Sequence, residues 1–584
     1  MRMSSAVPRS KIVYMSMEIG LEAALPTYSG GLGILAGDFL KAAADLHAPI
    51  VGVTLLHRKG YFHQHLSPAG QQSESPVIWD PNTLLQPLPV TVRVPIEGRP
   101  VHVRPWLYTI QGITGHQLSI YMLDTALAEN SVFDQTLTDH LYGGDDRYRL
   151  CQETLLGLGG VAVMHALGRS TDLIYHMNEG HSALLALALL ERRARGGDLA
   201  NITETDIEAV RSHCVFTTHT PVPAGHDRFP MNLVHSVLGE VRTCLLERLG
   251  FSSTGELNMT SLALYFSRYI NGVAMKHGEV SRDMFPTFPI SAITNGVHAT
   301  TWTAPPFQKL FDKHMAPWRR DNNYLRYARG MSVDEIRAAH AEAKRRLLDD
   351  VAERTGIRLP MEVMTLGFAR RAAEYKRAPL LLTDYERLRR IAREVGPIQI
   401  LYAGKAHPRD DAGKEMIKGV FRAGAELGND VRVVYIENYD MSLALELVSG
   451  VDLWLNTPAR PLEASGTSGM KAALNGVPSF SILDGWWIEG HYEGHTGWSI
   501  GNGTEDPASE LTSLYDKLEH VILPMYYTEP NRYAEIMRST IAINGSFFNT
   551  QRMLLQYLSN AYFPVEFVPA AASSPSPDPV KSSV

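Results

Sequence analysis

Short apolar runs rich in β-branched residues alternate with longer segments of helical spacing along most of the chain. This alternation is typical of α/β proteins, in which helices connect buried parallel strands. The first buried strand is predicted at residues 11–17. Further strands are predicted at DLIYHMN (172–178), HCVFTTHT (213–220), MEVMTLGF (361–368), VDLWLN (451–456) and VPSFSIL (477–483).

Two segments depart from this alternation. Between Val90 and Thr125 apolar and polar residues alternate singly on both sides of a Glu97-Gly98 turn, which predicts a hairpin-rich insertion. Residues 332–355 are polar and rich in strong helix formers, and Ser332 and Glu335 have the spacing of a capping box. We expect a long helix there and assign it no function.

A chain of 584 residues is too long for one hydrophobic core. We predict a first domain at 1–300 with a β-rich insertion around 71–130, and a second domain at 301–563. The segment 564–584 is rich in Pro, Ala and Ser, which predicts a disordered tail.

The composition argues against several classes of partner. The net charge of -7 provides no field that would attract nucleic acid or an anionic membrane. The three cysteines, Cys151, Cys214 and Cys244, are widely spaced and show no disulfide or zinc pattern. The first residues contain no long apolar leader region, and no apolar run approaches the length of a membrane span. We therefore expect a cytoplasmic protein that acts on a small or neutral substrate.

Candidate chemistry begins with the segment PLEASGTSGMKAALNG at 461–476, between two predicted strands. Small residues at the start of a helix allow backbone N–H groups to approach an anion closely. Lys471 follows on the first turn, where it could be a counter-charge for phosphate or an amine held for covalent chemistry. From the glycines alone, an ordinary strand-to-helix turn is the favoured alternative.

A second glycine loop, GGLG at 30–33, also precedes a segment of helical spacing. A packing turn and a phosphate or sugar site are equally compatible with it. Polar residues then collect after the strands at 172–178 and 213–220, and a metal site is one interpretation of them: His176, Glu179, His181, His219 and His226. We reject a metal because the set lacks a histidine pair at i and i+4 on one helix, and because polar residues at strand ends more often bind a ligand. Structural hydrogen bonds are the alternative for His176 and His226.

A run of basic residues, RRAAEYKR at 370–377, directly follows the predicted strand at 361–368. Such runs usually form a solvated face. Here the position after a buried strand favours ligand binding, and a site that holds two phosphates needs several cations to offset their repulsion.

These motifs together resemble those of the α-glucan phosphorylases, the family of glycogen, starch and maltodextrin phosphorylases, in a short form. EASGTSGMKAALNG resembles the family's pyridoxal-phosphate signature, and GGLG, NEGH (178–181), THT (218–220), TNG (294–296) and RRAAEYKR resemble its other segments. The resemblance runs from about Lys11 to Tyr562. It implies the glycosyltransferase-B arrangement, in which two Rossmann-like domains face each other across a cleft.

The resemblance also implies a role for each matching residue. Lys471 would carry pyridoxal 5′-phosphate as a Schiff base, and the cofactor would also contact Arg370, Tyr439 and the amides of Gly466, Thr467 and Ser468. Orthophosphate would bind to Arg371, Lys376 and the Gly31 backbone, beside Tyr375. Glucose would contact His219, Asn295, Glu463, Ala464 and Ser465, and the acceptor sugar would lie toward Glu179 and His181. Arg370, Asp410 and Asp440 replace a lysine, an aromatic residue and an arginine of the family pattern.

The implied reaction is phosphorolysis of a terminal α-1,4-linked glucose by orthophosphate, giving glucose 1-phosphate with retention. Lys471, Arg371, Lys376 and His219 would carry the catalysis, and the cofactor phosphate would relay a proton, because the second pKa of a phosphate monoester lies near 6. The alternatives are a nucleotide-sugar glucosyltransferase, a catalytically silent glucan-binding protein and an aminotransferase. A homodimer is compatible with the resemblance, whereas the preferred glucan and its chain length are not determined by the sequence.

Overall fold

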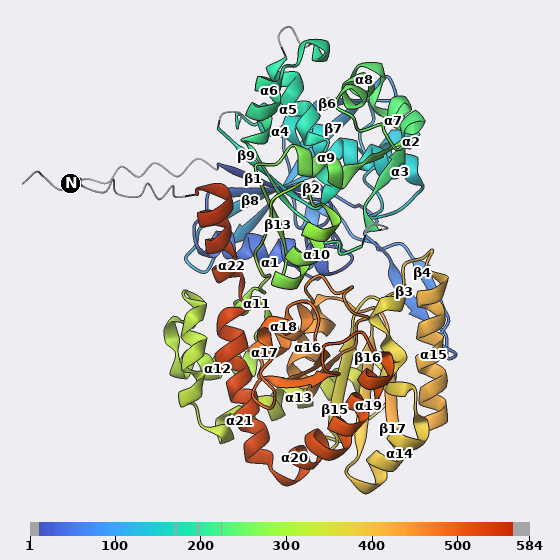
Figure 1. Cartoon of the computed structure of the whole chain (residues 1–584), viewed down its shortest axis with the longest axis vertical. Coiled ribbons are helices and arrows are strands. Elements are labelled where there is room, and N and C mark those ends of the chain that lie inside the picture. Colours follow the sequence, from blue (N-terminus) through green and yellow to red (C-terminus); the bar gives the residue numbers. More distant parts are fainter. Residues whose placement is uncertain (1–10, 170–171, 195–197, 223–224, 565–584) are drawn as a thin grey trace, which may run out of the picture.

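The computed structural model describes residues 11–169, 172–194, 198–222 and 225–564. The chain forms two lobes, each built around a mainly parallel sheet with helices on both faces (Figure 1). The predicted α/β class is confirmed. The predicted tail, from residue 565 onward, lies outside the described residues.

The sheet of the first lobe has ten strands. Its central part is parallel and runs in the order β8-β2-β1-β9-β10-β13-β14. Numbered along the chain, this order begins 3-2-1-4-5-6, which is the strand order of a Rossmann fold. The bounds are β1 Ile12–Ser16, β2 Ile50–Leu55, β8 Gln117–Asp124, β9 Ile174–Asn178, β10 Cys214–Thr217, β13 Tyr269–Gly272 and β14 Ile290–Ala292.

The β-rich segment of the first lobe extends this sheet. β7 (Arg99–Gln111) pairs with β8 in antiparallel fashion, and β5 (Gln86–Pro87) and β6 (Val92–Ile96) pair with β7. Between β6 and β7, Glu97 and Gly98 have φ values of 50° and 75°, which a tight two-residue hairpin turn requires. The predicted hairpins are confirmed, and β8 makes them part of the central sheet through its parallel pairing with β2.

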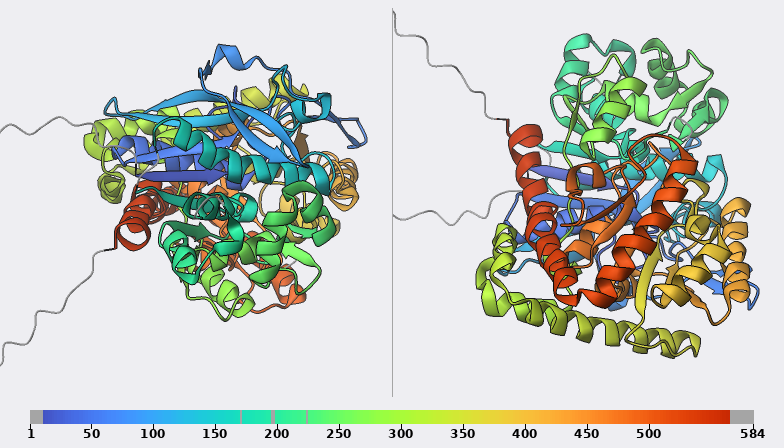
Figure 2. Two further views of the ribbon diagram at one scale, coloured as in Figure 1. Left: turned by 90° about the horizontal axis from the view of Figure 1, so that it is seen from above. Right: turned by 60° about the horizontal axis from the view of Figure 1, so that its bottom comes forward.

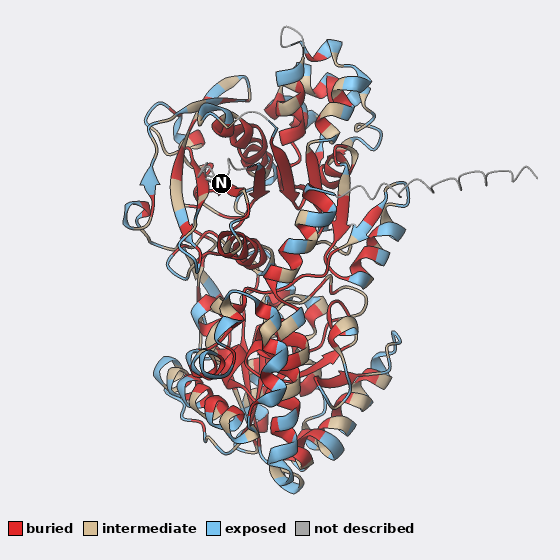
Figure 3. Cartoon of the chain, turned by 90° about the vertical axis from the view of Figure 1, so that its left-hand side faces the viewer, coloured by how far each residue is buried: buried red, intermediate tan, exposed pale blue. Residues whose placement is uncertain are grey.

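The sheet of the second lobe has six parallel strands in the order β17-β16-β15-β18-β19-β20. This is again 3-2-1-4-5-6 along the chain. The bounds are β15 Met364–Ala369, β16 Ile398–Ala403, β17 Val431–Ile436, β18 Leu453–Asn456, β19 Ser479–Ile482 and β20 Gly497–Ile500. Most of these strands are buried along their whole length, because helices cover both faces of the sheet (Figure 3).

The long helix predicted at 332–355 is confirmed as α13 (Val333–Thr355), which runs along the base of the second lobe (Figure 2). The predicted capping box is wrong. The Ser332 hydroxyl accepts a hydrogen bond from the Asp334 amide at 3.1 Å. Glu335 instead forms ion pairs with Lys313 and His314 on the preceding helix α12 (Pro305–His314), which lies within reach of its longer side chain.

Two segments connect the lobes by crossing from one to the other. The helix α22 (Thr550–Tyr557) follows the second sheet but packs against α1 (Gly31–Asp45) of the first lobe (Figure 1). Its Tyr557 hydroxyl lies 3.1 Å from Thr217 Oγ1. In the opposite direction, the hairpin of β3 (His63–Leu66) and β4 (Gln72–Ser75) lies beside α15 (Asp411–Leu427) of the second lobe. We call this hairpin, residues 63–75, the strap.

The predicted domain boundaries stay predictions. The helix α22 lies within the predicted second domain, but it packs against the first lobe. Of the helices that the structure describes, none combines the length and the apolar character that crossing a bilayer requires.

Candidate active site

Each sheet has one point at which the strand order reverses, between β1 and β9 in the first lobe and between β15 and β18 in the second. Ligands of doubly wound sheets bind beyond the carboxyl ends of the strands at such points. The residues that follow these strands are polar. They are Glu18 after β1, Glu179 after β9 and Arg370 after β15, while Asn456 ends β18.

Three of the predicted residues meet in the second lobe. Arg370 Nη2 donates to Glu463 Oε2 at 2.6 Å, and its Nη1 donates to Asn456. Lys376 Nζ lies 2.8 and 2.7 Å from the two oxygens of Glu463. Burial alone would raise the pKa of Glu463, but Arg370 and Lys376 outweigh it and lower the pKa to about 2. Glu463 is therefore ionised and holds two buried cations at one place.

Arg371 differs from these neighbours because it has no acidic partner within the described ranges. Its side chain is exposed but lies among tyrosines of both lobes. Desolvation opposes its charge, while Tyr375 of the second lobe and Tyr61 and Tyr142 of the first raise its pKa. Arg371 thus presents a permanent positive charge where the lobes meet, and that charge is free to pair with an anion.

Lys471 lies on the short helix α17 (Ser468–Leu474), and its amine is buried. Nζ packs 3.7 Å from the centre of the Trp302 ring. Burial lowers the pKa of Lys471 to about 8. No carboxylate or carbonyl within the described part of the chain accepts a hydrogen bond from this amine. A substantial fraction of Lys471 is therefore neutral, and so nucleophilic, near pH 8.

The segment that follows β19 holds the loop before α17 in place by hydrogen bonds. The Glu463 amide donates to Asp484 Oδ2 at 2.9 Å, and the Trp486 amide donates to the Ser465 carbonyl at 2.8 Å. Burial raises the pKa of Asp484 to about 6. Gly469 is required here, because a Cβ at this position would lie 2.7 Å from the Trp486 ring. The loop is therefore rigid, with Ala464, Gly466, Thr467 and Ser468 half-buried at its edge.

In the first lobe, His219 and Glu179 form one hydrogen-bonded group. His219 Nε2 lies 2.6 Å from Asn178 Oδ1, and the His219 amide donates to Glu179 Oε2 at 2.8 Å. Burial lowers the pKa of His219 to about 3, so its ring is neutral. Glu179 also accepts from the Gly180 amide and the Thr220 hydroxyl. With both oxygens engaged, Glu179 positions the loop that carries His219.

The glycine loop at 30–33 starts α1 as predicted, and its amides face a carboxylate that the sequence did not single out. Glu18 Oε2 accepts from the amides of Ser29 at 2.5 Å and Gly30 at 3.2 Å. The Tyr142 hydroxyl donates to Glu18 Oε1 at 3.0 Å. None of these bonds involves the amide of Gly31, the group that the sequence assigns to orthophosphate.

Several candidate residues carry buried polar atoms without a hydrogen-bond partner in the described part of the chain. They are Asn295 Oδ1, Ser465 Oγ, Arg370 Nε and His181 Nδ1. The other nitrogen of His181, Nε2, lies 3.2 Å from Asp227 Oδ2. Native proteins rarely leave buried polar atoms unpaired, so these atoms are open to partners from outside the chain, either water or a ligand.

The three departures from the family pattern have local explanations. Asp410 caps α15 and accepts from the Gly413 amide, and Asp440 caps α16 (Met441–Gly450) and accepts from the Leu443 amide, both at 2.9 Å. Arg370 uses its planar fork to reach two partners at once, Asn456 and Glu463. Tyr439 lies beside Arg370, and burial raises the pKa of its hydroxyl.

His176 and His226 make structural bonds. His176 lies between Tyr562 and Thr217, and His226 Nδ1 lies 2.8 Å from Thr260 Oγ1. Among the described residues there is no group of three or more side chains suited to a metal.

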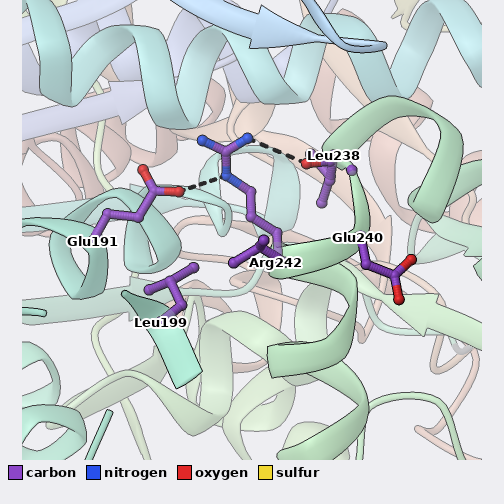
Figure 4. Close-up of a pocket in the computed structure, with 7 residues that line it drawn as sticks. Glu191, Leu199, Leu238, Glu240 and Arg242 are labelled. Atoms are coloured by element: carbon purple, nitrogen blue, oxygen red, sulfur yellow. Dashed lines mark hydrogen bonds and ion pairs between the residues drawn. The ribbon is translucent and has the colours of Figure 1, made fainter. Parts of the chain in front are cut away.

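A surface pocket lies apart from this site. It has a volume of about 270 Å³, and its lining includes Leu199, Leu238 and Arg242 (Figure 4). Arg242 pairs there with Glu191 at 2.7 Å and donates to the Leu238 carbonyl. None of the candidate residues lines this pocket.

Two Rossmann-like lobes with polar groups gathered at both switch points form a two-domain α/β protein with the glycosyltransferase-B arrangement. A family model described as carbohydrate phosphorylase matches residues 245–494. The chain is 38% identical to the maltodextrin phosphorylase of Thermococcus litoralis over 94% of this chain and 70% of that protein. It is 37% identical to the glycogen phosphorylase of Mycobacterium tuberculosis, over 95% of this chain and 71% of that protein. The chain belongs to the carbohydrate phosphorylase family.

A third relative has nearly the same length as this chain. An uncharacterized protein of Methanocaldococcus jannaschii is 32% identical over 94% of this chain and 99% of its own length.

Sequence reasoning missed Glu18, Asp38 and Asp484. Each is buried, and Glu18 and Asp484 contact segments that the sequence had singled out, while Asp38 accepts a hydrogen bond from Trp302. A signal was present for Asp38, an acidic residue within the apolar face of the helix after the glycine loop. Such a residue needs a buried partner.

Proposed function

We propose that this chain is an α-glucan phosphorylase that transfers the terminal α-1,4-linked glucose of a glucan to orthophosphate, with pyridoxal 5′-phosphate as cofactor. The observation that carries the proposal is Arg371, a cation without an acidic partner in the described ranges, beside the paired Arg370 and Lys376 where the two lobes meet. Phosphorolysis needs a site for a dianion beside a sugar site, and this arrangement supplies one. The names of the relatives support the choice of an α-glucan.

The residues present fit the cofactor. Lys471 is a buried amine without an acceptor among the described residues, and its lowered pKa of about 8 favours covalent attachment to an aldehyde. Arg370 keeps a buried Nε unpaired and lies beside Tyr439. Arg370 and the amides of Gly466, Thr467 and Ser468 would hold the cofactor phosphate. When bound, that phosphate would supply a proton-relay group with a pKa near 6.

Two of the candidate carboxylates, Glu463 and Glu179, are poorly suited to be the acid of this reaction. Glycosidases use one protonated and one ionised carboxyl group. Here the pKa of Glu463 is held at about 2, and both oxygens of Glu179 accept hydrogen bonds from the chain. Orthophosphate would instead give a proton to the leaving glycosidic oxygen as the bond from C1 to that oxygen breaks. One of its oxygens then forms the new bond to C1, on the same face of the ring.

The remaining residues would bind and orient the substrates. Arg371 and Lys376 would hold orthophosphate, with Tyr375 beside them and the Gly31 amide opposite. The neutral His219 and the unpaired Asn295 Oδ1 would hydrogen-bond the glucose, together with Glu463, Ala464 and Ser465. His181, with an unpaired Nδ1, and the loop fixed by Glu179 would lie toward the acceptor sugar.

The decisive test is release of glucose 1-phosphate from maltodextrins of graded length in orthophosphate, with and without added pyridoxal 5′-phosphate. We expect activity that depends on the cofactor, and a Lys471→Ala protein that binds none and is inactive. After borohydride reduction, mass spectrometry should find the cofactor on the peptide that contains Lys471. Glucose transfer from a nucleotide sugar by a cofactor-free protein would contradict the proposal. A homodimer and a cytoplasmic location stay predictions.

A further inference from the structure

A buried acid of the first lobe contacts the tryptophan on which the Lys471 amine packs. Asp38 lies on α1 and is only 1% exposed. Its Oδ2 accepts a hydrogen bond from Trp302 Nε1 at 2.7 Å and from the His298 amide at 3.2 Å. The face of the same Trp302 ring packs against Lys471 Nζ at 3.7 Å. A single indole thus connects an acid of the first lobe with the lysine of the second.

Trp302 is held both at its ring and at its backbone. Asp38 holds its N–H group, and Asn475, which follows α17, donates from Nδ2 to the Trp302 carbonyl at 2.7 Å. Asn475 Nδ2 also donates to the Lys471 carbonyl at 3.0 Å. The ring and the lysine therefore belong to one hydrogen-bonded unit, and a contact made through the flat face of a ring depends on the orientation of that ring.

We propose that Asp38 is a positioning residue for Lys471, because its buried carboxylate fixes the indole on which the amine packs. This inference rests on the proposed function, in which Lys471 carries the cofactor. The other Asp38 oxygen, Oδ1, is buried and has no hydrogen-bond partner in the described structure. The charge of Asp38 is thus only partly neutralised by hydrogen bonds, and it acts at short range in a desolvated region.

The charges around Lys471 act in opposite directions. Burial lowers the pKa of Lys471, Asp38 raises it, and Lys41, one turn further along α1, lowers it. Lys41 donates to Thr301 Oγ1 at 3.3 Å, and burial lowers its pKa in turn. Farther along the same helix, Asp45 is paired with His298 at 2.9 Å. Asp38 and Lys41 are therefore the two charges of the first lobe that bear on the amine.

The test uses the full-length protein from which pyridoxal 5′-phosphate has been removed. In capture, the neutral Lys471 amine attacks the aldehyde carbon, gives up two protons and forms a carbon–nitrogen double bond, while the aldehyde oxygen leaves as water. The capture rate should rise with pH as the amine loses its extra proton. It is followed by the cofactor's absorbance, and attachment is verified by the mass of the borohydride-reduced Lys471 peptide.

Asp38→Asn keeps an oxygen that accepts from Trp302 but removes the charge, so the midpoint of the capture profile should fall by about 1 pH unit. Lys41→Met should move the midpoint in the opposite direction. Trp302→Phe keeps the ring but loses the N–H group, so the midpoint should stay in place while capture slows about threefold to tenfold, corresponding to one lost hydrogen bond. Asp45→Asn, on the same helix but paired with His298, is the matched control and should leave the profile unchanged.

The outcomes separate this inference from the proposed function. Capture profiles of Asp38→Asn and Lys41→Met that both overlay that of the parent protein would overturn the inference and leave the proposed function standing. A parent protein that captures no cofactor at Lys471 would overturn both. Should Asp38→Asn fail to fold, Trp302→Phe decides, and cofactor capture by this variant at the rate of the parent protein would overturn the inference.

Discussion

The two lobes share one strand order, and their switch points can be compared residue by residue. In the first lobe the strand ends carry Glu18, Asn178 and Glu179, and the His219 ring among them is neutral. In the second lobe the same positions carry Arg370 and Asn456, with Arg371 and Lys376 close by. One fold thus presents hydrogen-bonding groups on one side and cations on the other. A reaction between a neutral sugar and an anion requires this division.

The lobes also differ in how they bury their polar groups. The first lobe buries four neutral histidines, His57, His176, His219 and His277, whose pKa values burial lowers to about 3 or 4. Both lobes also contain ion pairs, such as the half-buried Arg149 with Asp227 at 2.7 Å in the first lobe and the buried Lys344 with Asp452 at 2.6 Å in the second. A buried neutral histidine resists protonation, whereas a buried ion pair requires its charges to be kept. The four histidines should therefore make the first lobe respond more strongly to acid than the second.

The largest expected effect is the response of the first lobe to acid. The histidine pKa values of the folded state lie below the value of about 6.5 in an unfolded chain, so protons bind preferentially to the unfolded state. Their contribution to stability is complete above about pH 6.5 and is lost as the pH falls toward 3–4. At pH 5 protonation of the unfolded chain should lower the free energy of unfolding by about 2 kcal/mol for each histidine, about 8 kcal/mol in total.

Hydrogen exchange measured at pH 7 and pH 5 checks this prediction. Strands β9 and β10 should lose protection before β15 and β16, since Glu463, with a pKa of about 2, loses its contribution only as the pH falls from about 4.5 toward 2. Equal loss of protection in both lobes would show that the buried histidines do not make the first lobe more sensitive to acid.

The second expected effect is the cost of losing the shared carboxylate. Glu463→Gln leaves Arg370 and Lys376 buried and uncompensated, and breaking such a pair costs about 3–5 kcal/mol. Urea unfolding should show this loss, and orthophosphate should restore more stability to the variant than to the parent protein. Glu335→Gln, at an ion pair on the protein surface, is the control. A loss no larger than that of the control would show that Glu463 does not hold the two cations.

The third prediction distinguishes Arg371 from Arg377, two of the three arginines of RRAAEYKR. Arg371→Ala should lower kcat/KM for orthophosphate about 10²–10³-fold, comparable to the loss of one preorganised charge partner, with little change in Tm. The matched control is Arg377→Ala. Arg377 donates to the carbonyls of Thr457 at 3.0 Å and Pro458 at 2.7 Å and pairs with Glu510 at 2.7 Å. Its loss should lower Tm and leave KM for orthophosphate unchanged. If instead Arg377→Ala raised KM for orthophosphate and Arg371→Ala lowered Tm, the binding role would belong to Arg377 and the structural role to Arg371.

The smallest effect concerns the strap that joins the lobes. Gln72 Nε2 donates to the Ala406 carbonyl at 2.9 Å, and the Ala406 amide donates back to Gln72 Oε1 at 3.0 Å. Gln72→Ala should cost about 1–2 kcal/mol of local stability, because it leaves the buried Ala406 groups unpaired. Lys414→Met removes only the half-exposed pair with Glu74 and should cost at most about 1 kcal/mol. Exchange of the strap amides measures both, and equal effects would mean that the buried bonds do not hold the strap.

Sequence reasoning predicted much of the local structure. The buried strands, the helix at 333–355 and the tight turn at Glu97-Gly98 follow from periodicity and turn chemistry, which act over a few residues. The grouping of Arg370 with Lys376 was also predictable, because both follow one strand closely. The capping box was wrong, since Glu335 found partners on another helix that its local sequence does not describe.

The sequence by itself determined where the strands end and which side chains stand at those ends, because these follow from spacing along the chain. Only the tertiary structure decided which of them meet. Glu463 reaches back across 93 positions to Arg370, Trp302 joins Asp38 to Lys471, and Tyr557 returns to the first sheet. Periodicity specifies the face on which a residue lies, whereas its neighbour on that face is selected by the packing of whole lobes.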